Sequence, residues 1–286
     1  MGRILITGAE GQLGRDATRV LGEHHEMLGL GKTELDVTKF DSVEDVLGES
    51  GADFVLHLAA LTHVDEAERV PDEAYLVNAI GTRNIARAAQ RIGAKLIYVS
   101  TDYVFSGQQT TPYTEFDPPC PINCYGHSKL MGEMYARSLC PNHLVLRVSW
   151  LYGQHGSNFV RTILRLATSG GPVRVVDDQT GSPTWTKEVV RQLAVLLQRD
   201  AVGIYHCSAH GACTWYEFAL AILKEYDLDV ACHPISTSEF GAPAKRPAYS
   251  VLANRVLELE QADVMRNWRV SFEEFALEDR AGRSST

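Results

Sequence analysis

The sequence predicts an α/β protein built on a doubly wound parallel sheet, with a smaller C-terminal lobe. In residues 1–150, short apolar runs rich in β-branched residues alternate with longer amphipathic stretches. The short runs are apolar throughout, as strands are when helices cover both faces of a parallel sheet. After about Trp150 this rhythm becomes less regular. We therefore place the sheet in residues 1–150 and the lobe mainly in residues 151–286, with some later segments returning to the sheet.

The individual elements follow from these patterns. The strands expected in the first half are Arg3–Thr7, His25–Leu30, Asp53–Leu58, Lys95–Ser100 and His143–Val148. The helices expected between them are Gln12–Leu21, Ser42–Glu49, Asp72–Ile92 and Tyr125–Ser138. Gly93 is placed to end the third helix in a left-handed cap. The later elements are expected to be the helices Phe159–Ala167, Lys187–Leu197 and Trp215–Glu225 and the strands Val173–Val176 and Ile204–His206. The polar tail Asp279–Thr286 is predicted to be frayed.

Composition excludes several classes of partner. The net charge of -9 disfavours nucleic acid and anionic membrane surfaces. No apolar run reaches the length that spans a membrane, and the first residues are typical of a strand rather than a signal peptide. The six cysteines form no CxxC pair and no zinc spacing, so we expect free thiols, no metal and a cytoplasmic location.

A glycine-rich turn follows the first strand and opens the first helix. Gly8 permits a tight turn, Gly11 lets the backbone approach a pyrophosphate, and Gly14 lets the helix pack closely on the strand. The N–H groups at the start of the helix, around Gln12 and Leu13, then face the phosphates. A plain Gly-rich turn is the alternative. The position at the first β–α junction favours a dinucleotide site, which makes residues 1–150 a Rossmann-like domain.

The segment after the second strand bears on the choice of cofactor. Enzymes selective for NAD usually have an acid here, to bind the adenosine ribose. This chain has Lys32, which is suited to a 2′-phosphate, although an exposed loop lysine explains it equally well. Asp36 is also suited to capping a turn. We therefore expect NADPH or NADH as the cofactor.

Small residues follow the third strand. Ala59 and Ala60, with Thr62 beyond them, leave room for a cofactor to lie across the sheet. Asn78 falls inside a predicted helix, where asparagine is mildly unfavourable. A polar partner near the active site would explain it, and so would an exposed helix face.

Three residues near the fourth strand suggest carbonyl reduction. Tyr125 and Lys129 lie four apart at a helix start, so they share a face roughly 6 Å apart. An ammonium favours the phenolate form of a tyrosine, whose unperturbed pKa is about 10, and so makes its proton easier to donate. The hydroxyl of Thr101 can stabilise a developing alkoxide. Tyr125 and Lys129 alone are also compatible with a solvated helix face, but the combination with Thr101 and the glycine turn favours catalysis.

Together these motifs resemble the extended short-chain dehydrogenase/reductases and, more finely, the dTDP-4-dehydrorhamnose reductase family. The resemblance covers nearly the whole chain in order. Its matching segments are Gly8–Gly14, Glu34–Thr38, Ala59–Glu68, Asn78–Ala86, Ser100–Gly107, Tyr125–Glu133, Arg147–Gly153, Asn158–Val160, Asp178–Trp185 and Lys245–Leu252. The segments STDYVF and DQTGSPT are more specific to this family than the shared Tyr125–Lys129 spacing.

The resemblance implies roles for residues along the chain. Tyr125 would donate the proton, and Lys129 would assist from the nicotinamide ribose. Asp36 and Val37 would lie at the adenine. The substrate-binding residues would be Thr101, Asp102, Trp150 and Arg246. Arg246 would bind the substrate pyrophosphate, with a surface arginine as the alternative.

The implied reaction is hydride transfer to the C4 ketone of a dTDP-4-dehydro-6-deoxy-L-sugar, with residues 151–286 as the nucleotide-sugar lobe. Some family members form homodimers with magnesium held by glutamates at the interface. Arg15 occupies one of those positions here, which puts both the metal and that dimer in doubt. A nucleotide-sugar epimerase and a non-catalytic regulatory subunit of the methionine adenosyltransferase type are the alternative interpretations.

Overall fold

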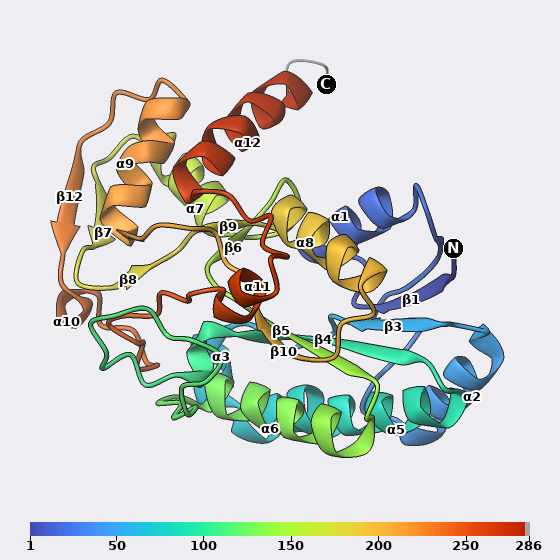
Figure 1. The fold of residues 1–286 in the computed structure, drawn as a ribbon. Coiled ribbons are helices and arrows are strands. Elements are labelled where there is room, and N and C mark those ends of the chain that lie inside the picture. Colours follow the sequence, from blue (N-terminus) through green and yellow to red (C-terminus); the bar gives the residue numbers. More distant parts are fainter. Residues whose placement is uncertain (284–286) are drawn as a thin grey trace.

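The computed structural model describes residues 1–283 and contains a six-stranded parallel sheet in the order β10-β5-β4-β3-β1-β2 (Figure 1). Its strands are β1 (Arg3–Thr7), β2 (Glu26–Leu30), β3 (Phe54–His57), β4 (Lys95–Thr101), β5 (His143–Val148) and β10 (Gly203–His206). The first five agree with the predicted strands to within one residue at each end. The chain order reverses at β1, which lies between β2 and β3. Ligands of open α/β sheets bind beyond the carboxyl ends of the strands at such a reversal.

Helices cover both faces of the sheet, as its apolar strands predict. One layer contains α1 (Gln12–Leu21), α8 (Thr186–Gln198) and α11 (Arg255–Leu259); the other contains α2 (Phe40–Ser50), α5 (Thr82–Ile92) and α6 (Cys124–Leu139) (Figure 1). Successive side chains of a strand point to opposite faces. Ile4 and Ile6 accordingly pack in the core beneath α1 and α8, whereas Leu5 packs with α2 and α5. The second half of the chain thus supplies both a strand and a covering helix of the large sheet.

The predicted helix Asp72–Ile92 is confirmed, but it contains a π-helical stretch that was not expected. The segment begins as α4 (Pro71–Tyr75), widens into the π-helical η1 (Leu76–Gly81) and continues as α5. A further short helix, α3 (Val64–Arg69), precedes it and was not predicted. Gly93 ends α5 at φ 72°, as expected of a left-handed cap. π-helical turns occur often at functional sites, and η1 holds Asn78.

The C-terminal lobe has its own aromatic core. The helices α7 (Phe159–Ala167) and α9 (Trp215–Glu225) pack beside the parallel pair β7 (Val173–Val176) and β12 (Cys232–Ile235), and α12 (Trp268–Arg283) lies farther along the lobe (Figure 1). Buried aromatic side chains from these helices and from two short strands, Tyr152, Trp185, Phe218, Phe272 and Phe275, pack edge to face. The smaller elements are η2 (Asp102–Val104), β6 (Leu151–Tyr152), β8 (Thr180–Gly181), β9 (Thr184–Trp185), β11 (Cys213–Thr214) and α10 (Thr237–Phe240).

The predicted fraying of the tail is wrong over Asp279–Arg283, where α12 continues. Phe272 and Phe275 anchor the helix in the lobe core. Asp279 is buried and accepts two hydrogen bonds from Arg161, at 2.6 and 2.8 Å, so its charge is neutralised there. The polar composition of the tail gave no sign of this partner on α7. Residues 284–286 lie outside the described part of the chain.

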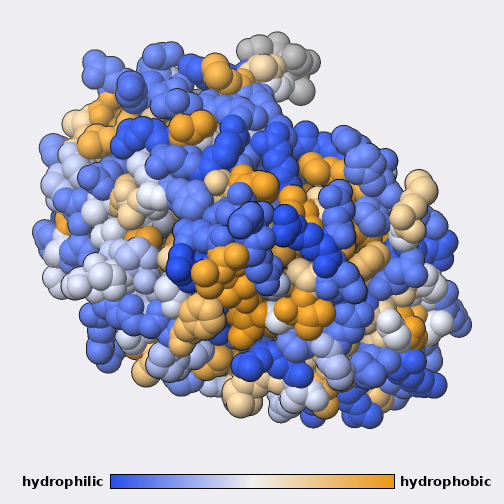
Figure 2. All heavy atoms as spheres, viewed as in Figure 1, coloured by the Kyte–Doolittle hydropathy of each residue, from blue (hydrophilic) through white to orange (hydrophobic). Residues whose placement is uncertain are grey.

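The surface shown in Figure 2 mixes hydrophilic and hydrophobic residues, with apolar groups gathered over the lower centre of that face. Across residues 1–283, no helix combines the length and the apolar character needed to cross a membrane.

Candidate active site

The glycine turn is shaped by close backbone approaches. Gly8 has φ +69°, and a Cβ added to it would lie 2.8 Å from the backbone nitrogen of Ala59, at the end of β3. A Cβ added to Gly14 would lie 2.6 Å from the carbonyl oxygen of Ala9. The structure thus brings together the two predicted cofactor segments that follow β1 and β3, and neither glycine can be replaced without displacing backbone.

The start of α1 suits an anion. Gly11 is its N-cap; within the described chain no side chain caps this end, and its first turn holds no acid. The N–H groups of that turn can therefore receive a diphosphate. Gln12 is half-buried, and its Oε1 accepts a long bond, 3.4 Å, from Asn158 of the lobe. The side chain of Leu13 is buried in the core, so only its backbone can reach a ligand.

The residues expected at the adenosine end divide into exposed and buried ones. Lys32 is exposed just beyond β2. Asp36 caps a turn: its Oδ1 accepts from the backbone N–H of Thr38 at 3.0 Å and from the Thr38 hydroxyl at 2.7 Å, and these bonds lower its pKa. Val37 is buried against Gly81. The turn-capping interpretation of Asp36 is therefore correct, and its second carboxylate oxygen has no bond in this turn.

The segment after β3 is fixed by Asn78. Its side chain accepts from the N–H of Leu61 at 2.8 Å and donates to the Leu61 carbonyl at 3.0 Å and to the Ser128 hydroxyl at 2.9 Å. The expectation of a polar partner near the active site is confirmed. Ala59 and Ala60 are half-buried and Thr62 is exposed. Because Ser128 lies between Tyr125 and Lys129, Asn78 joins the end of β3 to the face of α6 that carries both.

Tyr125 and Thr101 meet beyond the carboxyl end of β4. Thr101 lies close enough to Tyr125 to oppose the rise in the pKa of the phenol that burial causes. Thr101 accepts from the N–H of Tyr103 at 3.2 Å and donates to the carboxylate of Asp102 at 2.9 Å. The proton of Thr101 is thus directed at Asp102. Donation from Thr101 to a substrate would require its hydroxyl to rotate.

Lys129 lies along the same face of α6 but is turned toward β4. Its ammonium donates to the carbonyl of Val99 at 2.7 Å and lies 4.2 Å from the centre of the Tyr98 ring. Burial lowers the pKa of Lys129 to about 7, although the negative charge of Glu133 opposes that shift. Burial also raises the pKa of Tyr125, and the opposing influence of Thr101 does not offset this rise. The expected lowering of the tyrosine pKa is therefore wrong for this structure, and Tyr125 is a phenol at neutral pH.

A buried ionic network continues this face and was not predicted. Glu133, one turn beyond Lys129, accepts from Ser100 at 2.5 Å and binds Arg147 of β5 through two bonds, at 2.9 and 2.7 Å. Glu133 and Arg147 are both almost completely buried. Glu133 lies four residues after Lys129 on α6, so helical spacing alone predicts that it shares the face of Lys129. No feature of the sequence identified Arg147 as its partner.

Asp102 is less accessible than the sequence suggested. It is 2% exposed and accepts from Ser149 at 3.2 Å and from Thr101 at 2.9 Å. Burial raises its pKa to about 6, and these hydroxyl donors limit the rise. Asp102 therefore organises the hydroxyls around Thr101.

Trp150 occupies a strained position at the start of the lobe. Its backbone has φ +45°, which is costly for a bulky residue. Its ring stacks on that of Trp215, with 3.4 Å between centroids and 3° between planes. A side chain at Gly181 would overlap the indole of Trp150. The stack and the missing Cβ at Gly181 together hold Trp150 in place.

Arg246 is already engaged within the protein. Its guanidinium pairs with Asp65 of α3 through bonds of 3.1 and 2.9 Å, and the neighbouring Tyr103 contributes to the raised pKa of Arg246. The ring of Tyr103 packs edge-on against Tyr125, with centroids 5.7 Å apart. Arg246 is thus brought close to the predicted catalytic residues, in a pair that joins the lobe segment to the first half of the chain.

Lys32 and Asp36 follow β2, whereas Tyr125 lies beyond β4. Three strand spacings separate these strands, about 14 Å. An extended dinucleotide fits that arrangement, with its phosphates at the glycine turn between the two ends. Residues that would hold it are present at each point along this path.

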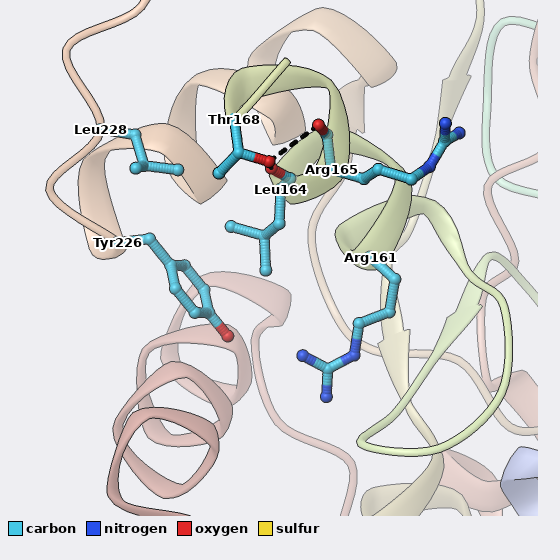
Figure 3. A pocket seen from close by; sticks show the side chains of 6 residues that line it. All are labelled: Arg161, Leu164, Arg165, Thr168, Tyr226 and Leu228. Atoms are coloured by element: carbon cyan, nitrogen blue, oxygen red, sulfur yellow. Dashed lines mark hydrogen bonds between the residues drawn. The ribbon is translucent and has the colours of Figure 1, made fainter. Parts of the chain in front are cut away.

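A separate hollow lies on the lobe and contains none of the predicted site residues. It is lined by α7 and the segment after α9, through Arg161, Leu164, Arg165, Thr168, Tyr226 and Leu228 (Figure 3). Arg161 is neutralised there by Asp279.

Over the described 283 residues, no group of three or more His, Cys, Asp or Glu side chains could hold a metal ion.

The doubly wound sheet and the tyrosine–lysine helix that follows its fourth strand place this protein among the short-chain dehydrogenase/reductases. Within that class, the family model described as RmlD substrate binding domain matches residues 2–280. The chain therefore belongs to the RmlD substrate binding domain family.

Individual relatives match this chain over nearly their whole length. The chain is 43% identical to the spore coat polysaccharide biosynthesis protein SpsK of Bacillus subtilis, over 97% of this chain and 98% of that protein. It is 37% identical to a dTDP-4-dehydrorhamnose reductase of Sinorhizobium fredii, over 94% and 95%. Among solved structures, a dTDP-4-dehydrorhamnose reductase from Bacillus anthracis in complex with NADP matches with a TM-score of 0.95 and 42% identity, over 97% and 99%.

Proposed function

We propose that this chain is an NAD(P)H-dependent reductase that converts a dTDP-4-dehydro-6-deoxy-L-sugar, with dTDP-4-dehydrorhamnose as the substrate, into the 4-hydroxy sugar dTDP-L-rhamnose. The observation that carries the proposal is the buried cluster of Thr101 at the end of β4 with Tyr125 and Lys129 on the adjoining face of α6. The full-length similarity to dTDP-4-dehydrorhamnose reductases supports the choice of substrate.

The reduced nicotinamide, when bound, supplies the hydride that the C4 carbon accepts. Tyr125 delivers its phenolic proton to the ketone oxygen, so that one hydride and one proton convert the ketone into an alcohol. Because the phenol is protonated at neutral pH, it can act as a general acid, which is typically worth about 10² to 10⁴ in rate. Lys129 stabilises the phenolate that remains, since an ammonium favours the charged form of a neighbouring acid.

The other side chains position these groups. Thr101 lies beside the phenol and limits the rise of its pKa, and Asn78 ties the helix carrying Tyr125 to the segment after β3. On the lobe side, Trp150 offers an aromatic surface to the nucleotide sugar. Arg246 offers a guanidinium, which binds phosphate through two parallel bonds. Residues 151–286 would then act mainly as the substrate-binding lobe.

Two finer proposals follow from the family and the cysteines. We place the enzyme in the cytoplasm, because all six cysteines are free thiols and such thiols persist in a reducing compartment. We also propose a homodimer whose interface differs from the glutamate-held magnesium interface of some family members, because Arg15 occupies one of those glutamate positions; light scattering of the purified chain tests that assembly.

The decisive experiment adds dTDP to the protein in a calorimeter, with and without NADPH, and then follows nicotinamide absorbance after addition of the keto sugar nucleotide. We expect dTDP to bind and to raise the melting temperature, because a ligand of the native state stabilises it by mass action. We also expect absorbance to fall in proportion to the sugar reduced. An epimerase would return its cofactor unchanged. No binding at millimolar dTDP would favour reduction of some other carbonyl, or a regulatory subunit.

A further inference from the structure

The carboxylate of Glu10 lies over Gly31, the residue that follows β2. A Cβ added to Gly31 would be 2.9 Å from the Glu10 carboxyl carbon and 3.0 and 3.2 Å from its two oxygens. The side chain of Glu10 therefore fills the space that a side chain at residue 31 would occupy. An acid is normally supplied here by the end of the second strand. In this chain the acid at that position is Glu10, which belongs to the glycine turn.

The backbone holds Glu10 in this position. Gly11 donates to the carbonyl of Gly8 at 3.1 Å, which closes the turn, and Ala9 donates to the carbonyl of Leu30 at 3.2 Å, which ties the turn to the end of β2. Arg15 donates to the backbone carbonyl of Glu10 at 3.0 Å. Three hydrogen bonds thus fix the main chain on either side of Glu10, while its side chain remains exposed to solvent.

The charges around Gly31 are predominantly negative. Glu34 accepts from the N–H of Gly31 at 2.6 Å, and Asp36 follows on the same segment. Lys32 is the cation of residues 31–36. A carboxylate accepts hydrogen bonds from ribose hydroxyls, whereas it repels a phosphate placed on the same ribose.

We propose that Glu10 is a specificity-determining residue for the cofactor, which accepts hydrogen bonds from the adenosine ribose hydroxyls and disfavours a 2′-phosphate. Lys32 acts in the opposite direction. The preference between NADH and NADPH is then a balance between these two side chains on either side of Gly31. This proposal rests on the proposed function only in requiring that a nicotinamide dinucleotide binds along the glycine turn.

The test measures the dissociation constants of NAD⁺ and NADP⁺ by calorimetry for the wild type, Glu10→Gln and Lys32→Ala. Glu10→Gln keeps the shape of the side chain and removes its charge. We expect it to tighten NADP⁺ about tenfold relative to NAD⁺, since a like-charge contact is removed. Lys32→Ala should shift the ratio the other way. Glu23→Gln is the matched control, because it removes the same charge from an exposed glutamate beyond the far end of α1.

Repeating the titrations with 2′,5′-ADP and ADP isolates the adenosine end from the nicotinamide. The same shift with these fragments would support the assignment. An unchanged NADP⁺ to NAD⁺ ratio in Glu10→Gln, or an equal shift in Glu23→Gln, would overturn it while leaving the proposed reductase intact. Failure of the wild type to bind either dinucleotide would overturn both proposals.

Discussion

The two sides of the candidate site hold their polar groups in different ways. On the α6 side, Thr101 donates to the carboxylate of Asp102 and Lys129 donates to the carbonyl of Val99, and both are buried together with Tyr125. On the lobe side, Trp150 stacks on a neighbouring indole and Arg246 pairs with a carboxylate from the other half. The first side is preorganised for proton transfer, and the second carries groups that a ligand must share or displace.

This difference has a physical basis. Electrostatic assistance to a reaction is greatest when donors are fixed before the substrate arrives. A charged ligand can instead be bound by a guanidinium, such as that of Arg246, whose orientation is fixed beforehand by an internal carboxylate, here that of Asp65. We therefore expect substitutions on the α6 side to change the chemical step, and substitutions on the lobe side to change ligand affinity. Three experiments test that separation.

The largest effect is expected from Tyr125→Phe. The ring and its packing against Tyr103 remain, but the proton donor is lost. We expect kcat for the keto sugar nucleotide to fall about 10² to 10⁴-fold, with the dissociation constant of NADP⁺ nearly unchanged. Tyr135→Phe, the same change on the half-buried side of α6, is the control. A Tyr125→Phe enzyme with near wild-type kcat would remove the catalytic assignment.

An effect of intermediate size is expected from Lys129, whose lowered pKa makes the free energy of unfolding depend on pH. Its native pKa is about 7, against an ordinary value of 10.5. Between those values the unfolded chain binds a proton that the native state does not, so the free energy of unfolding gains a contribution that rises with pH.

Relative to Lys129→Met, the wild type should therefore gain about 2 kcal/mol in unfolding free energy between pH 7 and pH 9. Urea unfolding at pH 7, 8 and 9 measures this, with Lys224→Met as the control because Lys224 is exposed on α9. Parallel pH profiles for wild type and Lys129→Met would show that burial does not depress this pKa.

The smallest effect is expected on the lobe side. Arg246→Ala should weaken dTDP binding about tenfold, since a paired phosphate contact is lost. Asp65→Asn should instead tighten dTDP a few fold, because the competing negative charge beside the guanidinium disappears. Neither variant should change the dissociation constant of NADP⁺. Calorimetry measures these affinities, with the exposed Arg174→Ala as the control. Equal weakening by Arg246→Ala and Asp65→Asn would mean that Asp65 is needed to hold the arginine.

Much of the fold was determined by the sequence alone. Apolar strands alternating with amphipathic helices require a covered parallel sheet, and the glycines of the first junction require a tight turn. Spacing of four on α6 placed Tyr125 and Lys129 on one face without reference to the rest of the chain. These features depend on backbone geometry and short-range periodicity, which local sequence encodes.

Tertiary structure decided which groups became partners. Arg147 for Glu133, Asp65 for Arg246 and Trp215 for Trp150 are distant in sequence and meet only after the sheet and lobe have packed. Glu10 likewise reaches Gly31 because β1 and β2 are neighbours in the sheet. The direction of each pKa shift was decided in the same way. The sequence spaced Lys129 and Tyr125 correctly, but in the fold Lys129 donates to the carbonyl of Val99, and burial raises the pKa of the phenol.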